Sequence, residues 1–368
     1  MPPPLDSLPP MIPNENAETA QAHAGMDSLG LLSPSLEDII TDLMHADLSP
    51  AKTDEQICLQ YTMWTLVVSQ STQLQHLREA FYQHTCSLLD KLTAQDTIAL
   101  QIEYAQACIL IVYYDLMKEN FRRGWISAGR CIRVVQLMRL FEVDRPQGKS
   151  DHQDWIEHEE KRRAFWIAYS LDIFISLRGE WPLSLSGYTA FVRLPAPEKN
   201  FDNNQYVEMP FLGTVLSNTT PCVLSPFAES IIFATLIRRI SAPIWEPREE
   251  DSPSDAPSPL SGNKESLSNT LRIRLKALTF KYQDAHLPFS DDPMEIFALM
   301  IAQSSALHLY GSRKSFGKTP DNGQNSTLAL QYEAQMASQE ISNLSISIFH
   351  LSPFKVESRG PFYALLIW

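Results

Sequence analysis

A series of apolar residues between positions 98 and 116 constrains the fold more than any other feature of this sequence. Its members recur in alternating steps of four and three residues: Ile98, Ile102, Ala105, Ile109, Val112 and Leu116. An α-helix places residues at that spacing on one face, so the series predicts an amphipathic helix. A continuous apolar stripe must be buried against other elements, which indicates a helix inside a packed core.

Several other stretches have the same periodicity, and none has the sustained alternation of a β-strand. One helix is predicted to begin at Thr53, because Thr53 and Gln56 fit a capping box. Another follows Gly124, with Trp125 expected on its buried side, and ends near the turn at 145–148. The remaining predicted helices cover residues 154–177, 226–240, 266–285, 293–310 and 328–349. The sequence therefore predicts an all-α, multi-helix fold.

Composition divides the chain into a leader and one domain. Residues 1–52 are rich in proline and acidic residues, and Lys52 is their only Lys or Arg, which predicts a disordered leader. Residues 53–368 are expected to form one helical domain. A loop-rich central stretch at 179–223 and a flexible linker at about 246–263 interrupt it, because both stretches carry several prolines.

Charge and cysteine content limit the partners expected for this chain. The formal charge is −13 over 368 residues, which disfavours nonspecific binding to a phosphate backbone. The five cysteines are scattered without C-x-x-C spacing, so no zinc site and no other cofactor is predicted within these residues. Neither a secretory signal nor an apolar run of the roughly 18 residues that a membrane span needs is present, so no membrane association is expected.

One acidic motif raises the alternative of a helical enzyme. The segment from Asp291 to Glu295, with Asp292 and Pro293, resembles the magnesium-binding motif of terpene cyclases. Proline is best tolerated in the first turn of a helix, so the two aspartates are better explained as capping residues. We therefore expect no catalytic or metal-binding residue. A non-regulatory scaffold protein is a further alternative.

A charged and aromatic cluster lies at 159–172. Glu159 can reach Arg162 and Arg163, which follow it by three and four residues on the same helix. Phe165, Trp166 and Tyr169 supply large apolar area next to these charges. Asp172 lies too far along the helix to reach Arg162, so a backbone amide of the loop beginning at Gly179 is its expected partner. By physical chemistry alone, this cluster is a set of solvated charges beside a core stripe.

The pattern Glu-x-x-Arg-Arg-x-Phe-Trp-x-x-Tyr-x-Leu-Asp, from Glu159 to Asp172, resembles the signature of the middle homology domain of fungal zinc-cluster transcription factors. Further segments occupy the positions expected for this family: 127–133, Gly179–Pro182, Leu194-Pro195, Leu271–Pro288 and Ser352–Phe354. The resemblance covers Thr53 to the C-terminus.

The resemblance implies a nuclear regulator of transcription whose helical regulatory domain acts through protein partners. Those partners would be the transcription machinery, a DNA-binding protein or a second copy, and a small-molecule inducer is also expected in this family. Control of a metabolic or secondary-metabolite gene set is the implied role. The signature residues, from Glu159 to Asp172, are expected to be architectural.

The sequence departs from the family in one respect. Family members usually carry an N-terminal six-cysteine cluster that holds two zinc ions and binds DNA, but these residues contain no such cluster. Zinc is therefore expected only if an upstream cysteine cluster exists, and direct DNA binding by this chain is not expected. A truncated gene model and a cysteine-free member that acts through another protein are both left open.

Overall fold

The computed structural model describes residues 52–95, 100–145, 155–179, 181–217, 223–241, 264–283, 292–315 and 323–350. Several predictions fall outside these ranges. They are the disordered leader apart from Lys52, Ile98 of the apolar series, residues 146–148 of the predicted turn, the helix ends at 154 and 284–285, the linker at 246–263, the aspartate at position 291 and the segment 352–354.

Most of the described residues are helical, which confirms the predicted fold class. Within the described ranges, the only β-type pairing is an isolated antiparallel bridge between Arg193 and Phe211. The α-helices are α2 (Asp54–Gln70), α3 (Arg78–Ala94), α4 (Ile102–Met117), α5 (Phe121–Leu137), α6 (Trp155–Gly179), α7 (Glu198–Asp202), α8 (Leu212–Ser217), α9 (Pro226–Ile240), α10 (Lys264–Gln283), α11 (Pro293–Ser315) and α12 (Gly323–His350). Short 3-10 helices are η1 (Gln75–Leu77), η2 (Leu140–Glu142) and η4 (Ser186–Phe191).

The helix boundaries follow from local chemistry. The Thr53 hydroxyl accepts a hydrogen bond from the Gln56 amide at 3.3 Å, and the Gln56 side chain accepts one from the Thr53 amide, so the predicted capping box is present. The end predicted for α5 was wrong: α5 ends at Leu137, whereas the prediction placed its end near residues 145–148. Arg139 adopts a left-handed conformation with φ of 53°, which ends the helical path.

Two further differences concern α3 and α5. The prediction omitted α3, whose buried face includes the polar side chain of Thr85 and so lacks a purely apolar stripe. The prediction also placed Trp125 on the buried side of α5, but this side chain is 48% exposed.

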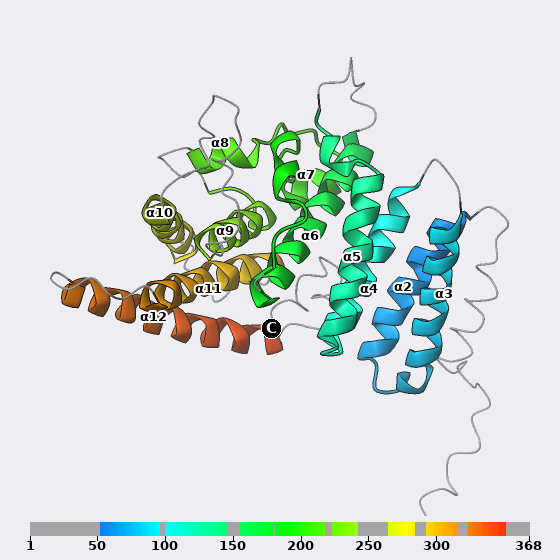
Figure 1. The fold of residues 1–368 in the computed structure, drawn as a ribbon, viewed down its shortest axis with the longest axis horizontal. Coiled ribbons are helices and arrows are strands. Elements are labelled where there is room, and N and C mark those ends of the chain that lie inside the picture. Colours follow the sequence, from blue (N-terminus) through cyan, green and yellow to red (C-terminus); the bar gives the residue numbers. More distant parts are fainter. Residues whose placement is uncertain are drawn as a thin grey trace, which may run out of the picture. The chain divides into compact units, whose positions relative to one another are not determined.

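Helix α6 lies between two groups of helices (Figure 1). On one side α2 packs against α3 and α4, and α4 packs against α5; both α4 and α5 contact α6. On the other side α6 contacts α9, which packs against α10 and α11, and α11 packs against α12. A helix with neighbours on both sides cannot show a strong polar face, and α6 accordingly buries residues around most of its circumference.

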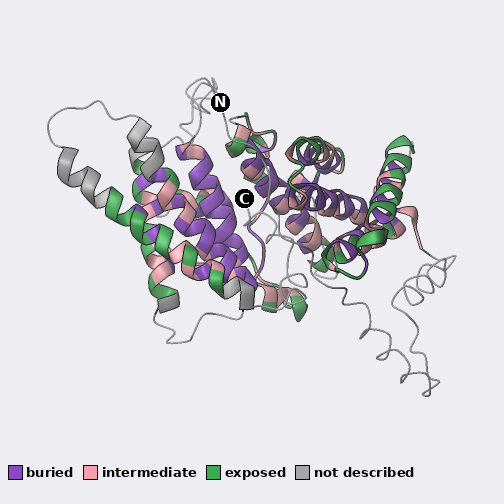
Figure 2. Ribbon diagram, turned by 90° about the horizontal axis from the view of Figure 1, so that it is seen from below, coloured by how far each residue is buried: buried purple, intermediate pink, exposed green. Residues whose placement is uncertain are grey.

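The core follows the inward faces of these helices (Figure 2). Its largest fully buried side chains include Phe165 and Trp166 on α6, Phe233 on α9 and Phe297 on α11. A smaller cluster of Ile296, Met300 and Leu344 joins α11 to α12. Among the described helices, none is long and apolar enough to cross a membrane.

Candidate functional site

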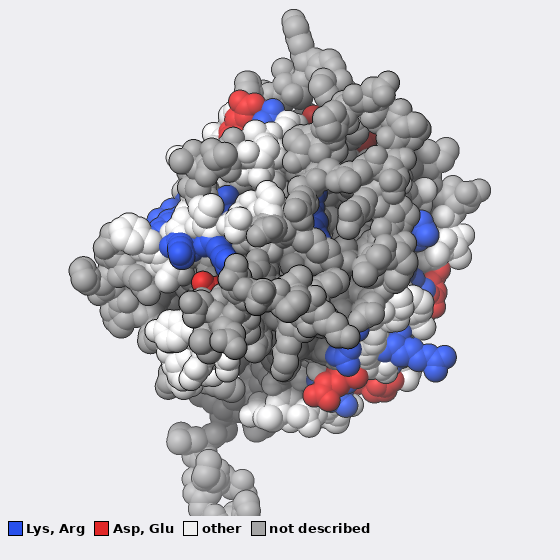
Figure 3. Space-filling view, turned by 60° about the vertical axis from the view of Figure 1, so that its left-hand side comes forward, with Lys and Arg blue, Asp and Glu red and all other residues white. Residues whose placement is uncertain are grey.

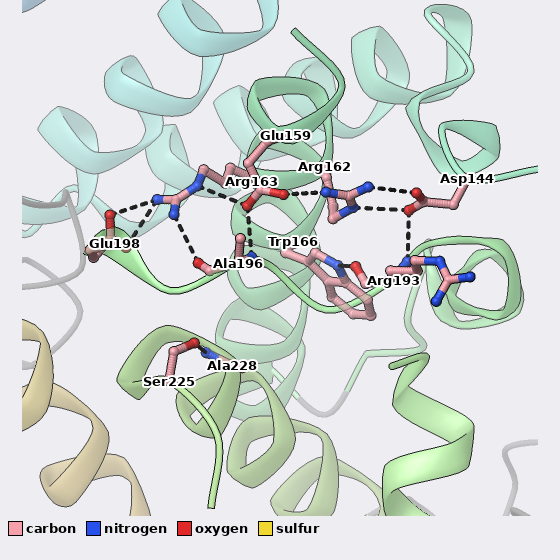
Figure 4. A network of polar contacts seen from close by, with 10 residues as sticks. All are labelled: Asp144, Glu159, Arg162, Arg163, Trp166, Arg193, Ala196, Glu198, Ser225 and Ala228. Atoms are coloured by element: carbon pink, nitrogen blue, oxygen red, sulfur yellow. Dashed lines mark hydrogen bonds and ion pairs between the residues drawn. The ribbon is translucent and has the colours of Figure 1, made fainter. Parts of the chain in front are cut away.

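The signature residues of α6 lie beside an extended segment, residues 192–196, that crosses the helix (Figure 4). Glu159, Arg162, Arg163 and Trp166 fall at positions i, i+3, i+4 and i+7, which places them on one helix face. Apart from the single bridge at Arg193, this segment is in neither helix nor sheet, so its backbone groups need other hydrogen-bond partners.

Glu159 is the central acceptor of this network and is 0% exposed. The interpretation of the cluster as solvated charges, which physical chemistry alone favoured, was therefore wrong. Its Oε1 accepts hydrogen bonds from the Ala196 backbone amide at 2.8 Å and from Arg163 Nε at 3.1 Å. Its Oε2 accepts from Arg162 Nη1. The carboxylate is therefore compensated in the interior by two guanidinium groups and one backbone donor.

Arg162 joins Glu159 to Asp144, which lies just after η2. Its guanidinium forms a bidentate pair with the Asp144 carboxylate, with Nε to Oδ2 at 3.0 Å and Nη2 to Oδ1 at 2.6 Å. Burial lowers the pKa of Arg162, but hydrogen bonds and charge from Asp144 and Glu159 outweigh burial and raise it overall. Asp144 Oδ2 also accepts from the Arg193 backbone amide at 2.8 Å. The Arg162–Asp144 pair therefore connects α6 with both η2 and the extended segment.

Arg163 connects α6 with α7. Its Nη1 donates to both Glu198 carboxylate oxygens at 3.0 and 2.9 Å, and its Nη2 donates to the Ala196 carbonyl at 3.0 Å. The guanidinium carbon also lies 4.2 Å from the centre of the Phe201 ring. Donation from Nε, Nη1 and Nη2 to three different groups, together with stacking on an aromatic ring, uses the planar guanidinium, which lysine could not replace.

The aromatic members of the signature anchor the other end of the segment. Trp166 Nε1 donates to the Arg193 carbonyl at 2.6 Å. Phe165 and Trp166 lie edge to face at 5.2 Å between ring centres, and the Tyr169 hydroxyl is 3.3 Å from the Thr235 hydroxyl on α9. The same residues thus fill the core and hold the extended segment against it.

Asp172 contacts the loop that follows α6. Its Oδ2 accepts from the backbone amides of Ser184 at 2.8 Å and Leu185 at 2.9 Å. This is the backbone-amide contact predicted for the loop that begins at Gly179. The side chain is 5% exposed, so these two bonds satisfy a buried carboxylate.

Some members of the network could not be assigned from the sequence. Asp144 and Glu198 lie 18 and 35 residues from their arginine partners, and no local pattern connects them. Leu194-Pro195 was the available signal for the extended segment, but it does not identify the bonds to α6. A second buried ion pair, Glu229 on α9 with Arg274 on α10 at 2.7 Å, was also not predicted.

Three observations concern the metal-binding and thiol chemistry of the described residues. No group of three or more His, Cys, Asp or Glu is placed to hold a metal ion within the described ranges. Asp292 caps α11, because its carboxylate accepts from the Met294 amide at 2.9 Å. Burial raises the pKa of the Cys58 and Cys131 thiols to about 12, which suppresses the reactive thiolate.

Comparisons with known proteins agree with the signature. A family model described as the fungal specific transcription factor domain matches residues 52–288. The tropolone cluster transcription factor of Talaromyces stipitatus is 60% identical, over 97% of this chain and 69% of its own length. The citrinin biosynthesis transcriptional activator of Monascus purpureus is 36% identical over 86% of this chain and 55% of its own. The pigment biosynthesis transcriptional activator of Monascus ruber is 34% identical over 84% and 57%.

This chain spans little more than half the length of the two Monascus relatives. No solved structure matches it. The matched family is the one that the Glu159–Asp172 signature predicted. The chain belongs to the family of the fungal-specific transcription factor domain.

Proposed function

We propose that this chain is the regulatory domain of a nuclear transcription regulator that activates a secondary-metabolite gene cluster. The observation that carries the proposal is the 60% identity to a tropolone cluster transcription factor, supported by two activators of citrinin and pigment biosynthesis. The family match over residues 52–288 supports the same role.

The signature network supports a regulatory domain that acts through its surfaces. Glu159, Arg162 and Asp144 are buried, and their charges are used to bind one another and the segment 192–196. Groups committed to such bonds cannot receive a ligand without breaking them. We therefore assign the signature residues an architectural role and assign protein contacts to the outer faces of the helices. In this proposal the domain has no enzymatic activity.

The negative charge of the chain disfavours direct contact with DNA, so another domain or protein would bind the DNA. The formal charge is −13, and on the face in Figure 3 the described Lys and Arg form small groups, several with Asp or Glu nearby. A DNA-binding face needs a more continuous basic surface. Contact with DNA is accordingly assigned to a DNA-binding segment or partner outside these residues.

Gene disruption tests this function. Transcripts of the biosynthetic genes that adjoin the locus are measured in the parent fungus, in a disruptant and in a disruptant complemented with the native gene. The proposal predicts a coordinated loss of these transcripts and their recovery on complementation. Unchanged transcripts of the neighbouring genes in the disruptant would contradict it.

Complementation with single-residue variants tests whether the signature network is needed for activation. Complementation with Arg162→Ala should restore fewer transcripts than complementation with Lys161→Ala, because Arg162 is buried in the network and Lys161 lies on the surface. Protein abundance is measured in both strains by immunoblot. Equal transcript recovery with Arg162→Ala would contradict the architectural role of the signature.

A further inference from the structure

A group of aromatic side chains and arginines, all exposed except the half-buried Phe121, lies where the start of α5 meets the end of α6. We name it the aromatic–arginine patch, and its members are Phe121, Arg122, Trp125, Ile126, Arg178 and Trp181. Trp125 is 48% exposed, Trp181 is 37% exposed and Ile126 is 61% exposed. Tryptophan and arginine contribute most of the binding energy in many protein interfaces. Two half-exposed tryptophans beside arginines therefore indicate a binding surface.

The aromatic rings of the patch contact one another. The ring centres of Trp125 and Trp181 are 5.0 Å apart, with an angle of 44° between their planes. Phe121 stacks on Trp181 with 6.0 Å between ring centres and 21° between planes. The Arg178 guanidinium carbon lies 4.4 Å from the centre of the Phe121 ring. The patch is therefore one contiguous surface built from two helix ends.

Backbone contacts hold Trp181 in place. Its amide donates to the Ser176 carbonyl at 3.2 Å, and its carbonyl accepts from Arg238 Nη2 at 3.1 Å. A Cβ atom at position 179 would lie 2.5 Å from the Trp181 ring, so the ring position requires glycine there. An exposed ring that is fixed before binding loses little conformational entropy when a partner covers it.

The charge of the patch is positive. The first turn of α5 has no acidic residue and includes Arg122 and Arg123. Arg123 lies 3.9 Å from the Asp115 carboxylate, so Arg122 supplies the uncompensated charge of this turn. Cations in a first turn are unfavourable next to the positive end of the helix dipole, so they add to a local positive potential. Arg122 forms no ion pair with any of the described residues, and its side chain faces solvent. An acidic partner would complement this potential.

We propose that the aromatic–arginine patch binds an acidic amphipathic helix of a partner protein. Leucine or isoleucine side chains of that helix pack on Trp125 and Trp181, and its carboxylates pair with Arg122 and Arg178. This inference rests on the proposed function, since it names the kind of partner through which the regulatory domain acts. As in helix-in-groove recognition, the apolar anchors of the bound helix recur at helical spacing, but here they pack on an exposed surface.

Peptide binding to the full chain tests the proposal. The probe is a fluorescently labelled synthetic helix of 14 residues with Leu or Ile at positions 1, 4, 5 and 8 and Asp or Glu at positions 2, 3 and 7. A scrambled peptide of the same composition is the control ligand. Fluorescence anisotropy should show saturable binding of the amphipathic peptide, weaker binding of the scrambled one, and loss of affinity with added salt.

Matched variants locate the binding surface. Arg122→Glu and Trp125→Ala should each raise Kd about ten-fold or more, as expected for interface anchors. Lys276→Glu and Phe280→Ala are the controls, because both side chains are exposed on α10 and likewise supply a cation and an aromatic ring. These control variants should leave Kd within about two-fold of the parent value. Urea unfolding midpoints of all four variants exclude global unfolding as the cause.

Two results would overturn the inference. One is the absence of saturable binding by the parent chain, or equal binding of the scrambled peptide. The other is an unchanged Kd in both patch variants. Cluster transcription is measured separately, so a chain that activates the cluster without binding the peptide contradicts this inference and leaves the proposed function intact.

Discussion

Replacing Arg162 with alanine should destabilise the domain more than any surface substitution on α6. The Arg162 side chain is 7% exposed, and the substitution removes its bonds to Asp144 and Glu159. Asp144 then keeps only the Arg193 amide as a donor from this network, while Glu159 keeps Arg163 and the Ala196 amide. Removing one partner of a buried ion pair typically costs about 3–5 kcal/mol. Because Glu159 stays partly compensated, we expect a loss near 3 kcal/mol.

Urea unfolding followed by tryptophan fluorescence measures this loss as a change in unfolding free energy. Lys161→Ala is the matched control, because Lys161 is adjacent on α6 but pairs with Glu157 at the surface. Surface pairs of this kind contribute about 0.3–0.5 kcal/mol. With an m-value of about 3 kcal/mol/M, the Arg162 variant should unfold about 1 M earlier in urea. The reasoning is refuted if both variants unfold within about 0.5 kcal/mol of each other.

Three other substitutions or treatments have defined outcomes. Asp172→Ala should lower the free energy of unfolding by about 1–3 kcal/mol, because two backbone amides lose their acceptor. Urea unfolding measures this loss, and an unchanged midpoint would contradict it. Burial raises the pKa of the Asp115 carboxyl above its usual value, so the folded state binds this proton more tightly than the unfolded chain does. The parent should therefore lose stability relative to Asp115→Asn as pH rises from about 4, the unfolded value, towards neutrality. A stability difference that is constant over this range would rule out that explanation. Under native conditions at about pH 8, iodoacetamide should modify the half-buried Cys86 before the buried Cys58 or Cys131. Peptide mass spectrometry measures the three rates, and equal rates would show that burial does not control the reactivity of these thiols.

The sequence was most informative where the chemistry is local. The capping box of Thr53 and Gln56 involves neighbours in sequence, and it is present in the structure. The reach from Glu159 to Arg162 and Arg163 follows from the geometry of a single helix, and both pairs form. Asp172 was assigned to a loop amide because no partner on α6 lay within its reach, and it contacts Ser184 and Leu185.

Features that depend on distant parts of the chain could not be predicted in this way. The pairing of Arg162 with Asp144 and of Arg163 with Glu198 depends on how loops cross α6, which leaves no periodic signal in the sequence. Helix α3 was missed for a related reason, since Thr85 on its buried face bonds to Thr65 on α2 at 2.9 Å. A buried polar residue with a tertiary partner interrupts the apolar pattern from which a helix is predicted.

Exposure of Trp125 also depends on tertiary structure. Its position on α5 fits the apolar stripe, but the Trp181 ring packs beside it at the surface and leaves 48% of the side chain exposed. Helical periodicity identifies the side of a helix that carries apolar residues. It does not distinguish burial in the core from presentation to a partner.

Hydrogen–deuterium exchange of residues 193–196 tests most directly whether the signature holds the extended segment to α6. In this account the amides of Arg193, Leu194 and Ala196 are bonded to Asp144, the Pro210 carbonyl and Glu159. They should therefore exchange slowly in the parent, although the segment is neither helix nor sheet. In Arg162→Ala the Asp144 and Glu159 carboxylates keep these amides as donors but lose the guanidinium that holds them in place. The Arg193 and Ala196 amides should therefore exchange much faster, while amides in the middle of α4 stay protected. Rapid exchange of these amides in the parent would contradict the account.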